Sequence, residues 1–283
     1  MLTGIIPFGF LQPIIINSGS TLLRVDNLVA NDSGFEKWVR GKKYDNLIFQ
    51  KAYWQEMMQL FNGPKILDLC DPDWFMYDAG IIEAGNHVHA ITCSSRELTD
   101  LVKSYFPDKI VEHVPDRLDL KTFPPPREVH QGKARKAVWF GYIQNAHETL
   151  PQLLPAIIET RLQLRIISNL PYSKKDGIFE LNPEFLFYEQ SKVNEQIKEA
   201  DILLNPHSDR AFFRYKSNNK SLIGWQLGLP VAVTVEDVMR FMSPDERNHE
   251  VSIMRPVVEQ DYKIEKIAEQ YRDIICRIRE RYF

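Results

Sequence analysis

Short apolar runs alternate with amphipathic segments along almost the whole of this chain of 283 residues. An apolar run of this kind is typical of a buried strand, and a segment with one apolar stripe is typical of a helix that covers a sheet. Their alternation predicts a mainly parallel sheet with helices on both faces. The first half of the chain has predicted strands at residues 4–7, 21–25, 46–49, 65–69, 87–92 and 110–114, and predicted helices at 52–61, 79–84 and 95–106.

One proline-rich segment interrupts this alternation. Pro124, Pro125 and Pro126 lie in a charged stretch without an apolar period, which is typical of a linker. A second series of strands is predicted at residues 137–141, 164–167, 184–188, 202–205 and 231–234. We therefore expect an α/β chain with two Rossmann-like, doubly wound domains. The expected boundaries are an N-terminal domain at 1–123, a linker at 124–136, a C-terminal domain at 137–257 and a final helix at 258–283.

Two helices carry clear sequence signals. Ser94 or Ser95 is suited to cap the helix at 95–106, and Glu97 places an acidic group in its first turn. Apolar residues recur at helical spacing through residues 262–283, which predicts an amphipathic helix with one buried face. We expect this closing helix to pack back across the domains.

Composition and charge argue against several classes of protein. The 35 basic and 38 acidic side chains leave a formal charge of -3, so no overall field draws the chain to a polyanion. No run reaches the roughly 18 apolar residues that a membrane-spanning helix needs. Residues 4–9 lack the cationic lead and cleavage site of a signal peptide. The 3 cysteines have no metal-ligand spacing, so we expect a reduced, cytoplasmic protein without a metal site.

The polar loop between the predicted strands 202–205 and 231–234 is the strongest site signal. Its candidate residues are Arg210, Lys216, Ser217, Asn218, Asn219 and Lys220. A helix is predicted to begin near Ser217, so both lysines are expected beside a helix N-terminus at the carboxyl edge of the sheet. Helix N-termini and ammonium groups bind phosphate. This loop therefore predicts a nucleotide-binding enzyme.

The first strand of the C-terminal domain supplies further donor-site candidates. Gly141 and Tyr142 follow that strand, where backbone amides can meet a diphosphate. Asn145 either contacts the same group or caps a helix, and we favour the cap.

The acceptor-site candidates lie in the N-terminal domain. Asp71 ends a strand, and its carboxylate either takes a proton from an acceptor hydroxyl or caps the next turn, although Asp73 is the better capping residue. Gly9 and Phe10 follow the first strand, where a glycine allows close approach of the backbone. Trp74 either stacks on a sugar or fills the core. Asp71 and Lys216 are the catalytic candidates.

Several short motifs follow one another in a known order. They are residues 67–71, 90–98, 111–116, 138–141, 164–167, 197–206 and 228–234. Together they resemble the GT-B glycosyltransferases, in particular the large retaining group similar to glycosyltransferase family 4. The resemblance implies a C-terminal domain that binds a nucleotide-sugar and an N-terminal domain that binds the acceptor, with a central cleft between them. It also implies that cationic side chains and helix N-termini replace a metal, and we favour a UDP-sugar over a GDP-sugar.

Two features of that group are absent from this sequence. Its members commonly carry two glutamates eight positions apart, and the corresponding places hold Tyr215 and Ile223. The arginine and lysine that usually follow the first strand of the donor domain are missing after Gly141. Either the polar residues of the loop replace these contacts or the site has lost catalysis, and we favour replacement.

The leading hypothesis is a glycosyltransferase that acts on a hydroxyl of a glycan, a lipid, a small molecule or a modified DNA base. For DNA, four basic residues around the linker could guide the backbone: Arg127, Lys133, Arg135 and Lys136. Two alternatives stay open. A nucleotide-sugar epimerase of the same fold would convert a UDP-sugar without an acceptor, and a non-catalytic nucleotide- or glycan-binding protein would account for the missing glutamates.

Overall fold

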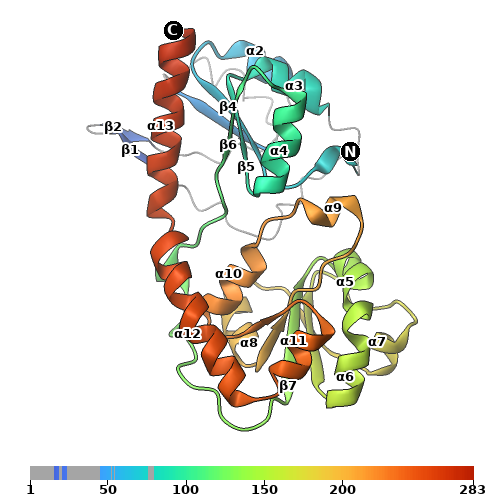
Figure 1. Cartoon of the computed structure of the whole chain (residues 1–283). Coiled ribbons are helices and arrows are strands. Elements are labelled where there is room, and N and C mark those ends of the chain that lie inside the picture. Colours follow the sequence, from blue (N-terminus) through green and yellow to red (C-terminus); the bar gives the residue numbers. More distant parts are fainter. Residues whose placement is uncertain (1–15, 19–20, 24–44, 52, 54, 76–79) are drawn as a thin grey trace. The chain divides into compact units, whose positions relative to one another are not determined.

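The chain forms two compact units, seen here in a computed structural model that describes residues 16–18, 21–23, 45–51, 53, 55–75 and 80–283 (Figure 1). Unit 1 comprises Met1–Asp116, Arg210–Ser217 and Glu265–Phe283. Unit 2 comprises Arg117–Asp209 and Asn218–Ile264. Each unit has its own parallel sheet with helices packed on it, so the expected α/β fold with two parallel sheets is confirmed.

The sheet of unit 1 has four parallel strands in chain order. They are β3 (Leu47–Gln50), β4 (Lys65–Leu69), β5 (Ala90–Cys93) and β6 (Ile110–His113). The helices between them are α2 (Gln55–Leu60), α3 (Ile81–His87) and α4 (Arg96–Tyr105). Ser95 caps α4 by accepting a hydrogen bond from the backbone N–H of Leu98, which confirms the predicted cap.

The two faces of this sheet bury different helices. Leu67, Leu69 and Ile91 pack on the side of α3 and α4, while the alternate residues Ile66 and Ala90 face α13 (Glu265–Tyr282). Four residues of α13 are buried: Tyr271, Ile274, Ile275 and Ile278. The closing helix is therefore amphipathic as predicted, and it returns the chain to the first unit.

The sheet of unit 2 has five parallel strands in the order β11-β10-β7-β8-β9. Their bounds are β7 (Lys136–Gly141), β8 (Gln163–Ser168), β9 (Glu184–Phe187), β10 (Ile202–Leu204) and β11 (Val231–Ala232). From β7 the chain proceeds outward to β8 and β9, then crosses back to β10 and β11. The strand order therefore reverses between β7 and β10, and open α/β sheets bind ligands at the carboxyl ends of the strands at such a point.

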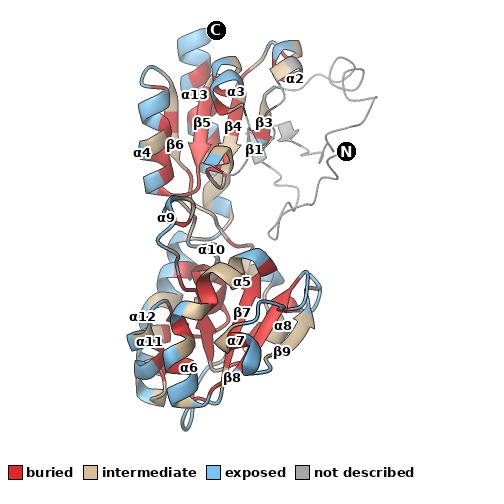
Figure 2. Cartoon of the chain, turned by 90° about the vertical axis from the view of Figure 1, so that its right-hand side faces the viewer, coloured by how far each residue is buried: buried red, intermediate tan, exposed pale blue. Residues whose placement is uncertain are grey.

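Helices cover both faces of this second sheet, and the buried residues lie along the strands (Figure 2). The helical segments of unit 2 are η2 (Leu120–Thr122), α5 (Ile143–Thr149), η3 (Leu150–Leu153), α6 (Leu154–Thr160), α7 (Gly177–Glu180), α8 (Val193–Lys198), α10 (Asn219–Gln226), α11 (Val235–Arg240) and α12 (Pro244–Asp261). Trp139, Ile166 and Leu204 point into one core with α5, α6 and α11. On the other face Leu203 and Val231 approach α10 closely.

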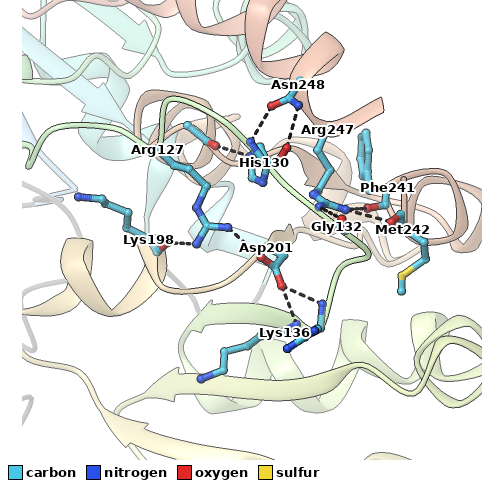
Figure 3. A network of polar contacts seen from close by, with 12 residues as sticks. Arg127, His130, Gly132, Lys136, Lys198, Asp201, Phe241, Met242, Arg247 and Asn248 are labelled. Atoms are coloured by element: carbon cyan, nitrogen blue, oxygen red, sulfur yellow. Dashed lines mark hydrogen bonds and ion pairs between the residues drawn. The ribbon is translucent and has the colours of Figure 1, made fainter. Parts of the chain in front are cut away.

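The segment 124–136, expected as a linker, is bound to unit 2 along its length (Figure 3). Arg127 forms an ion pair with Asp201 at 2.8 Å. The backbone N–H and C=O groups of His130 are both bonded to the side chain of Asn248, and the imidazole donates to the carbonyl of Gly228 at 2.8 Å. The segment is therefore part of the packed structure of unit 2.

The basic residues considered for DNA lie in and beside this segment. Arg127 is paired with Asp201, and Lys136 lies 3.4 Å from Glu184. Lys133 and Arg135 are exposed. Two of the four basic residues thus form ion pairs, which weakens the hypothesis that these residues guide a DNA backbone.

Two predicted strands differ from the structure in part. The strand predicted at 87–92 begins only at Ala90, because His87 ends helix α3. The strand predicted at 21–25 exists as β2 (Thr21–Leu23), but it pairs antiparallel with β1 (Ile16–Ser18) outside the parallel sheet. The longest helix that was not predicted is α12, which continues through Pro256. Within the described residues, no helix is long and apolar enough to cross a membrane.

Candidate functional site

Lys220 and Gly141 meet at the carboxyl end of β7. Lys220 is in the first turn of α10, and its Nζ lies 4.1 Å from the centre of the Trp139 ring. Gly141 has a φ of 143°, and a Cβ at this position would lie 2.9 Å from Lys220 Nζ. The aromatic face attracts the ammonium group, and the glycine lets it approach the backbone. A cation is thus held at the point where the strand order reverses.

The N-terminus of α10 is fixed at the same edge of the sheet. Asn218 is the N-cap residue, but its side chain makes no capping hydrogen bond. The positive end of the helix dipole is therefore not covered by the side chain of its own cap. In the middle of the helix, a Cβ on Gly224 would lie 2.5 Å from the side chain of Leu203, so this glycine lets α10 pack closely on β10.

A residue that the sequence interpretation missed organises the turn after β7. Asn169 accepts a hydrogen bond from the backbone N–H of Ile143 at 3.1 Å and so caps α5 from the end of β8. Tyr142 is the N-cap residue, and Asn145 lies inside the helix, so the interpretation of Asn145 as the cap is wrong. The sequence feature that could have indicated this role of Asn169 is the polar pair Ser168-Asn169 directly after an apolar run.

The polar loop predicted as one site is divided between the two units. Arg210, Lys216 and Ser217 belong to unit 1, whereas Asn218, Asn219 and Lys220 belong to unit 2. Arg210 is the N-cap residue of α9 (Ala211–Arg214). Ser217 is tied to unit 1 by a hydrogen bond from its hydroxyl to Asp116.

Lys216 lies among aromatic and charged groups of unit 1. Its Nζ is 4.7 Å from the centre of the Phe212 ring and 4.8 Å from that of Phe213. Burial lowers the pKa of Lys216, while the attraction of Asp71 opposes this effect. The side chain is therefore a half-buried cation whose charge is favoured by rings and a carboxylate.

Asp71 is bound by a lysine that the sequence interpretation missed. Lys51 Nζ forms a short ion pair with Asp71 Oδ2 and lies 3.5 Å from Asp73. Burial opposes the charge on Lys51, but these two carboxylates prevail and raise its pKa. The carboxylate of Asp71 thus binds a cation instead of capping the turn. Lys51 was not detectable in the sequence because it lies 20 residues before Asp71 and its role needs the pairing of β3 with β4.

The Trp74 side chain packs against the core of unit 1 and is only partly exposed to solvent. Its ring is half-buried against the core of unit 1 and makes an edge contact with Phe75 at 5.8 Å. Phe75 is the more exposed ring, at 41%. The other two acceptor-site candidates, Gly9 and Phe10, lie outside the described residues.

The two positions that correspond to the paired glutamates hold side chains that pack within the structure. Tyr215 contacts the Phe75 ring at 5.7 Å, and its carbonyl accepts a hydrogen bond from Ser95. Ile223 is buried within α10. Neither side chain has a carboxylate, so these two positions cannot make the contacts that the glutamates make.

Comparison with known proteins finds similarity in structure alone. No protein-family model matches the chain, and no curated protein matches its sequence. Anabaena Alr3699/HepE in complex with UDP and glucose gives a TM-score of 0.63 at 10% identity, over 85% of this chain and 80% of that one. TarM gives 0.57 at 10% identity, over 85% and 57%. The pneumococcal O-GlcNAc transferase GtfA in complex with UDP and GlcNAc gives 0.56 at 8% identity, over 86% and 59%.

These similarities show the fold. The chain has the two-sheet α/β architecture of these proteins, and the GT-B fold expected from the sequence is confirmed. The chain spans 56% of the matched chain in the Streptococcus pneumoniae accessory secretory protein structure and 59% of GtfA. Sequence identities of about 10% do not by themselves show that two proteins share an activity, so a function must rest on the chemistry of the site.

Proposed function

We propose that this protein is a glycosyltransferase that transfers a sugar from a UDP-sugar to an acceptor hydroxyl. The observation that carries the proposal is the position of Lys220 Nζ, against the backbone of Gly141 and in the first turn of α10. The strand order of unit 2 reverses at this place. The choice of UDP is supported by two structural neighbours, GtfA and HepE, whose structures are complexes with UDP.

The donor diphosphate would contact Lys220 and the amides around it. Gly141 and Tyr142 supply backbone at the end of β7, and Asn218 and Asn219 lie at the start of α10. When the bond from the anomeric carbon to the phosphate oxygen breaks, the leaving UDP gains negative charge. An ammonium group and a helix N-terminus placed there stabilise that charge without a metal ion. Asn145, in α5 of the same unit, is proposed as a further donor contact.

The acceptor would be bound by unit 1, with Asp71 as its polar anchor. Lys51 holds Oδ2 of this carboxylate, and among the described residues Oδ1 has no hydrogen-bond partner. Oδ1 is therefore suited to accept a hydrogen bond from the acceptor hydroxyl and then its proton. Lys216 is proposed as a second cation of unit 1 beside this carboxylate. Retention of anomeric configuration rests on the family resemblance, and the acceptor class includes glycans, lipids, small molecules and modified DNA.

Calorimetric titration of UDP into matched lysine variants tests the donor site. Lys220→Met keeps an apolar stem on Trp139 but removes the charge, and Lys133→Met removes a charge from an exposed site of the same unit. Loss of a charge-assisted contact of about 1.5–3 kcal/mol predicts UDP binding at least roughly tenfold weaker in Lys220→Met. Lys133→Met should bind UDP normally. Equal UDP affinity in both variants would remove the site assignment.

The same purified protein tests transfer. Incubation with a panel of UDP-sugars should release UDP slowly by hydrolysis and faster when the correct acceptor is added. UDP binding without hydrolysis or transfer to any acceptor would indicate a non-catalytic nucleotide-binding protein, as the missing glutamates allow.

A further inference from the structure

Unit 2 contains an open cavity of about 390 Å³ that shares no residue with the proposed donor site. It lies between the loop that follows β8 and the segment that runs from α7 to β9, and these elements can be followed in Figure 2. Its walls hold three aromatic rings, two prolines, one carboxylate and one carboxamide. The volume is within the range of about 300–1,000 Å³ that is typical of small-molecule sites.

The Tyr172 ring of the cavity is held in place by the surrounding structure. Tyr172 is buried, its hydroxyl donates to Asp176 at 2.8 Å, and its ring contacts His147. Asp176 also accepts hydrogen bonds from the backbone N–H groups of Ile178 and Phe179, so it caps α7. The wall is therefore preformed, and the ring of Phe179 remains 43% exposed on it. Such an exposed, positioned ring offers a flat apolar face to a ligand.

The polar groups of the cavity are neutral or negative. Glu180 and Asn182 are exposed, and within the described residues neither side chain forms a hydrogen bond. Asn182 has a φ of 48°, a left-handed conformation that asparagine tolerates better than most residues. Among the residues that the structure describes, no lysine, arginine or histidine lines the cavity. A phosphorylated ligand would meet only a carboxylate here, so the chemistry favours an uncharged ligand with hydroxyl groups.

We propose that this cavity binds one or two rings of a neutral saccharide. The C–H face of a sugar ring would lie on Phe179, and its hydroxyls would donate to Glu180 and exchange hydrogen bonds with Asn182. The site is separate from the donor site, so it provides a second point of attachment for a saccharide chain. The proposal goes beyond the proposed function, because binding here requires neither UDP nor transfer.

Titration with neutral tetrasaccharides tests the proposal in the full chain. The probes are the tetrasaccharides of β-1,4-glucose, α-1,4-glucose and β-1,4-N-acetylglucosamine, followed by saturation-transfer NMR and calorimetry. At least one should bind, and Phe179→Ala should weaken its binding roughly tenfold through loss of ring stacking and buried area. Glu180→Gln should weaken it by several-fold. Ile158→Ala removes an apolar side chain that is 55% exposed on α6 and does not line the cavity, and it should leave binding unchanged.

Four outcomes would overturn the proposal. The first two are the absence of binding by every tetrasaccharide and equal binding by Phe179→Ala and Ile158→Ala. The other two are binding of the saccharide at another surface and preferential binding of a proline-rich peptide to the cavity. Phe179 is exposed, so Phe179→Ala should keep the thermal midpoint and the UDP affinity of the unchanged protein. Failure of UDP binding in all proteins would count against the donor site and not against this cavity.

Discussion

Acid should weaken unit 2 through one buried histidine. His130 is 3% exposed and donates its Nε2–H to the carbonyl of Gly228, which follows the C-terminal end of α10. Burial lowers the pKa of His130 from 6.5 to about 4, with Arg127 and Arg247 adding to the effect and the Gly228 hydrogen bond opposing it. The folded state therefore binds this proton less readily than the unfolded state. Its contribution is intact above pH 6.5 and is lost as the pH falls toward 4.

The size of the effect follows from the two pKa values. Each unit of difference is worth 1.36 kcal/mol, so the loss is about 2 kcal/mol at pH 5 and about 3.4 kcal/mol once the pH is well below 4. Urea unfolding followed by hydrogen exchange in the β7 and β8 peptides would report the stability of unit 2 at pH 7.5 and pH 5.

A variant separates this histidine from the other acid-sensitive groups. His130→Gln keeps a side-chain N–H for Gly228 but does not titrate in this range. The loss of stability between pH 7.5 and pH 5 should be about 2 kcal/mol smaller in this variant than in the unchanged protein. An equal loss in both proteins would refute the assignment to His130.

Three further substitutions have defined expectations. Gly228→Ala should destabilise unit 2 by roughly 3 kcal/mol in urea unfolding, because the φ of 79° disfavours a side chain and the new Cβ would lie 2.3 Å from the Arg127 carbonyl oxygen; a change within 0.5 kcal/mol would contradict this packing. Arg247→Met should cost about 3 kcal/mol or more in the same assay, since its buried guanidinium donates to three backbone carbonyls, and unchanged stability would show that those carbonyls find other partners. Lys51→Met should slow sugar transfer roughly tenfold while UDP affinity stays constant, because the Asp71 carboxylate of unit 1 loses the ion pair that holds it in position. A loss of UDP affinity instead would contradict the assignment of this pair to the acceptor.

Local sequence signals predicted the sheets well. The strands β4 and β7 to β10 were found to within one residue at each end, because buried parallel strands are continuous apolar runs. A serine cap at Ser94 or Ser95 was predicted because the helix begins with polar residues and carries Glu97 in its first turn, and the structure shows that the cap is Ser95. The helix α12 was missed, since its buried residues include Arg247 and it contains Pro256, so it has no regular apolar stripe.

Local sequence signals could not predict that the polar loop is divided between the two units. Ser217 belongs to unit 1 through Asp116, 101 positions earlier, and Tyr215 through Ser95, 120 positions earlier. The pairing of Lys51 with Asp71 also depends on the pairing of two strands. In contrast, the position of Lys220 in the first turn of a helix was predicted from the sequence, because a helix start was expected near Ser217. The sequence could therefore indicate which residues carry charge near the sheet edges but not which unit each one joins.

A crystal structure of the protein with UDP tests the central claim most directly. The account predicts a phosphate oxygen within about 3 Å of Lys220 Nζ, with the phosphates beside the backbone of Gly141 and Tyr142 and the first turn of α10. UDP bound elsewhere in unit 2, with its phosphates out of reach of Lys220, would contradict it.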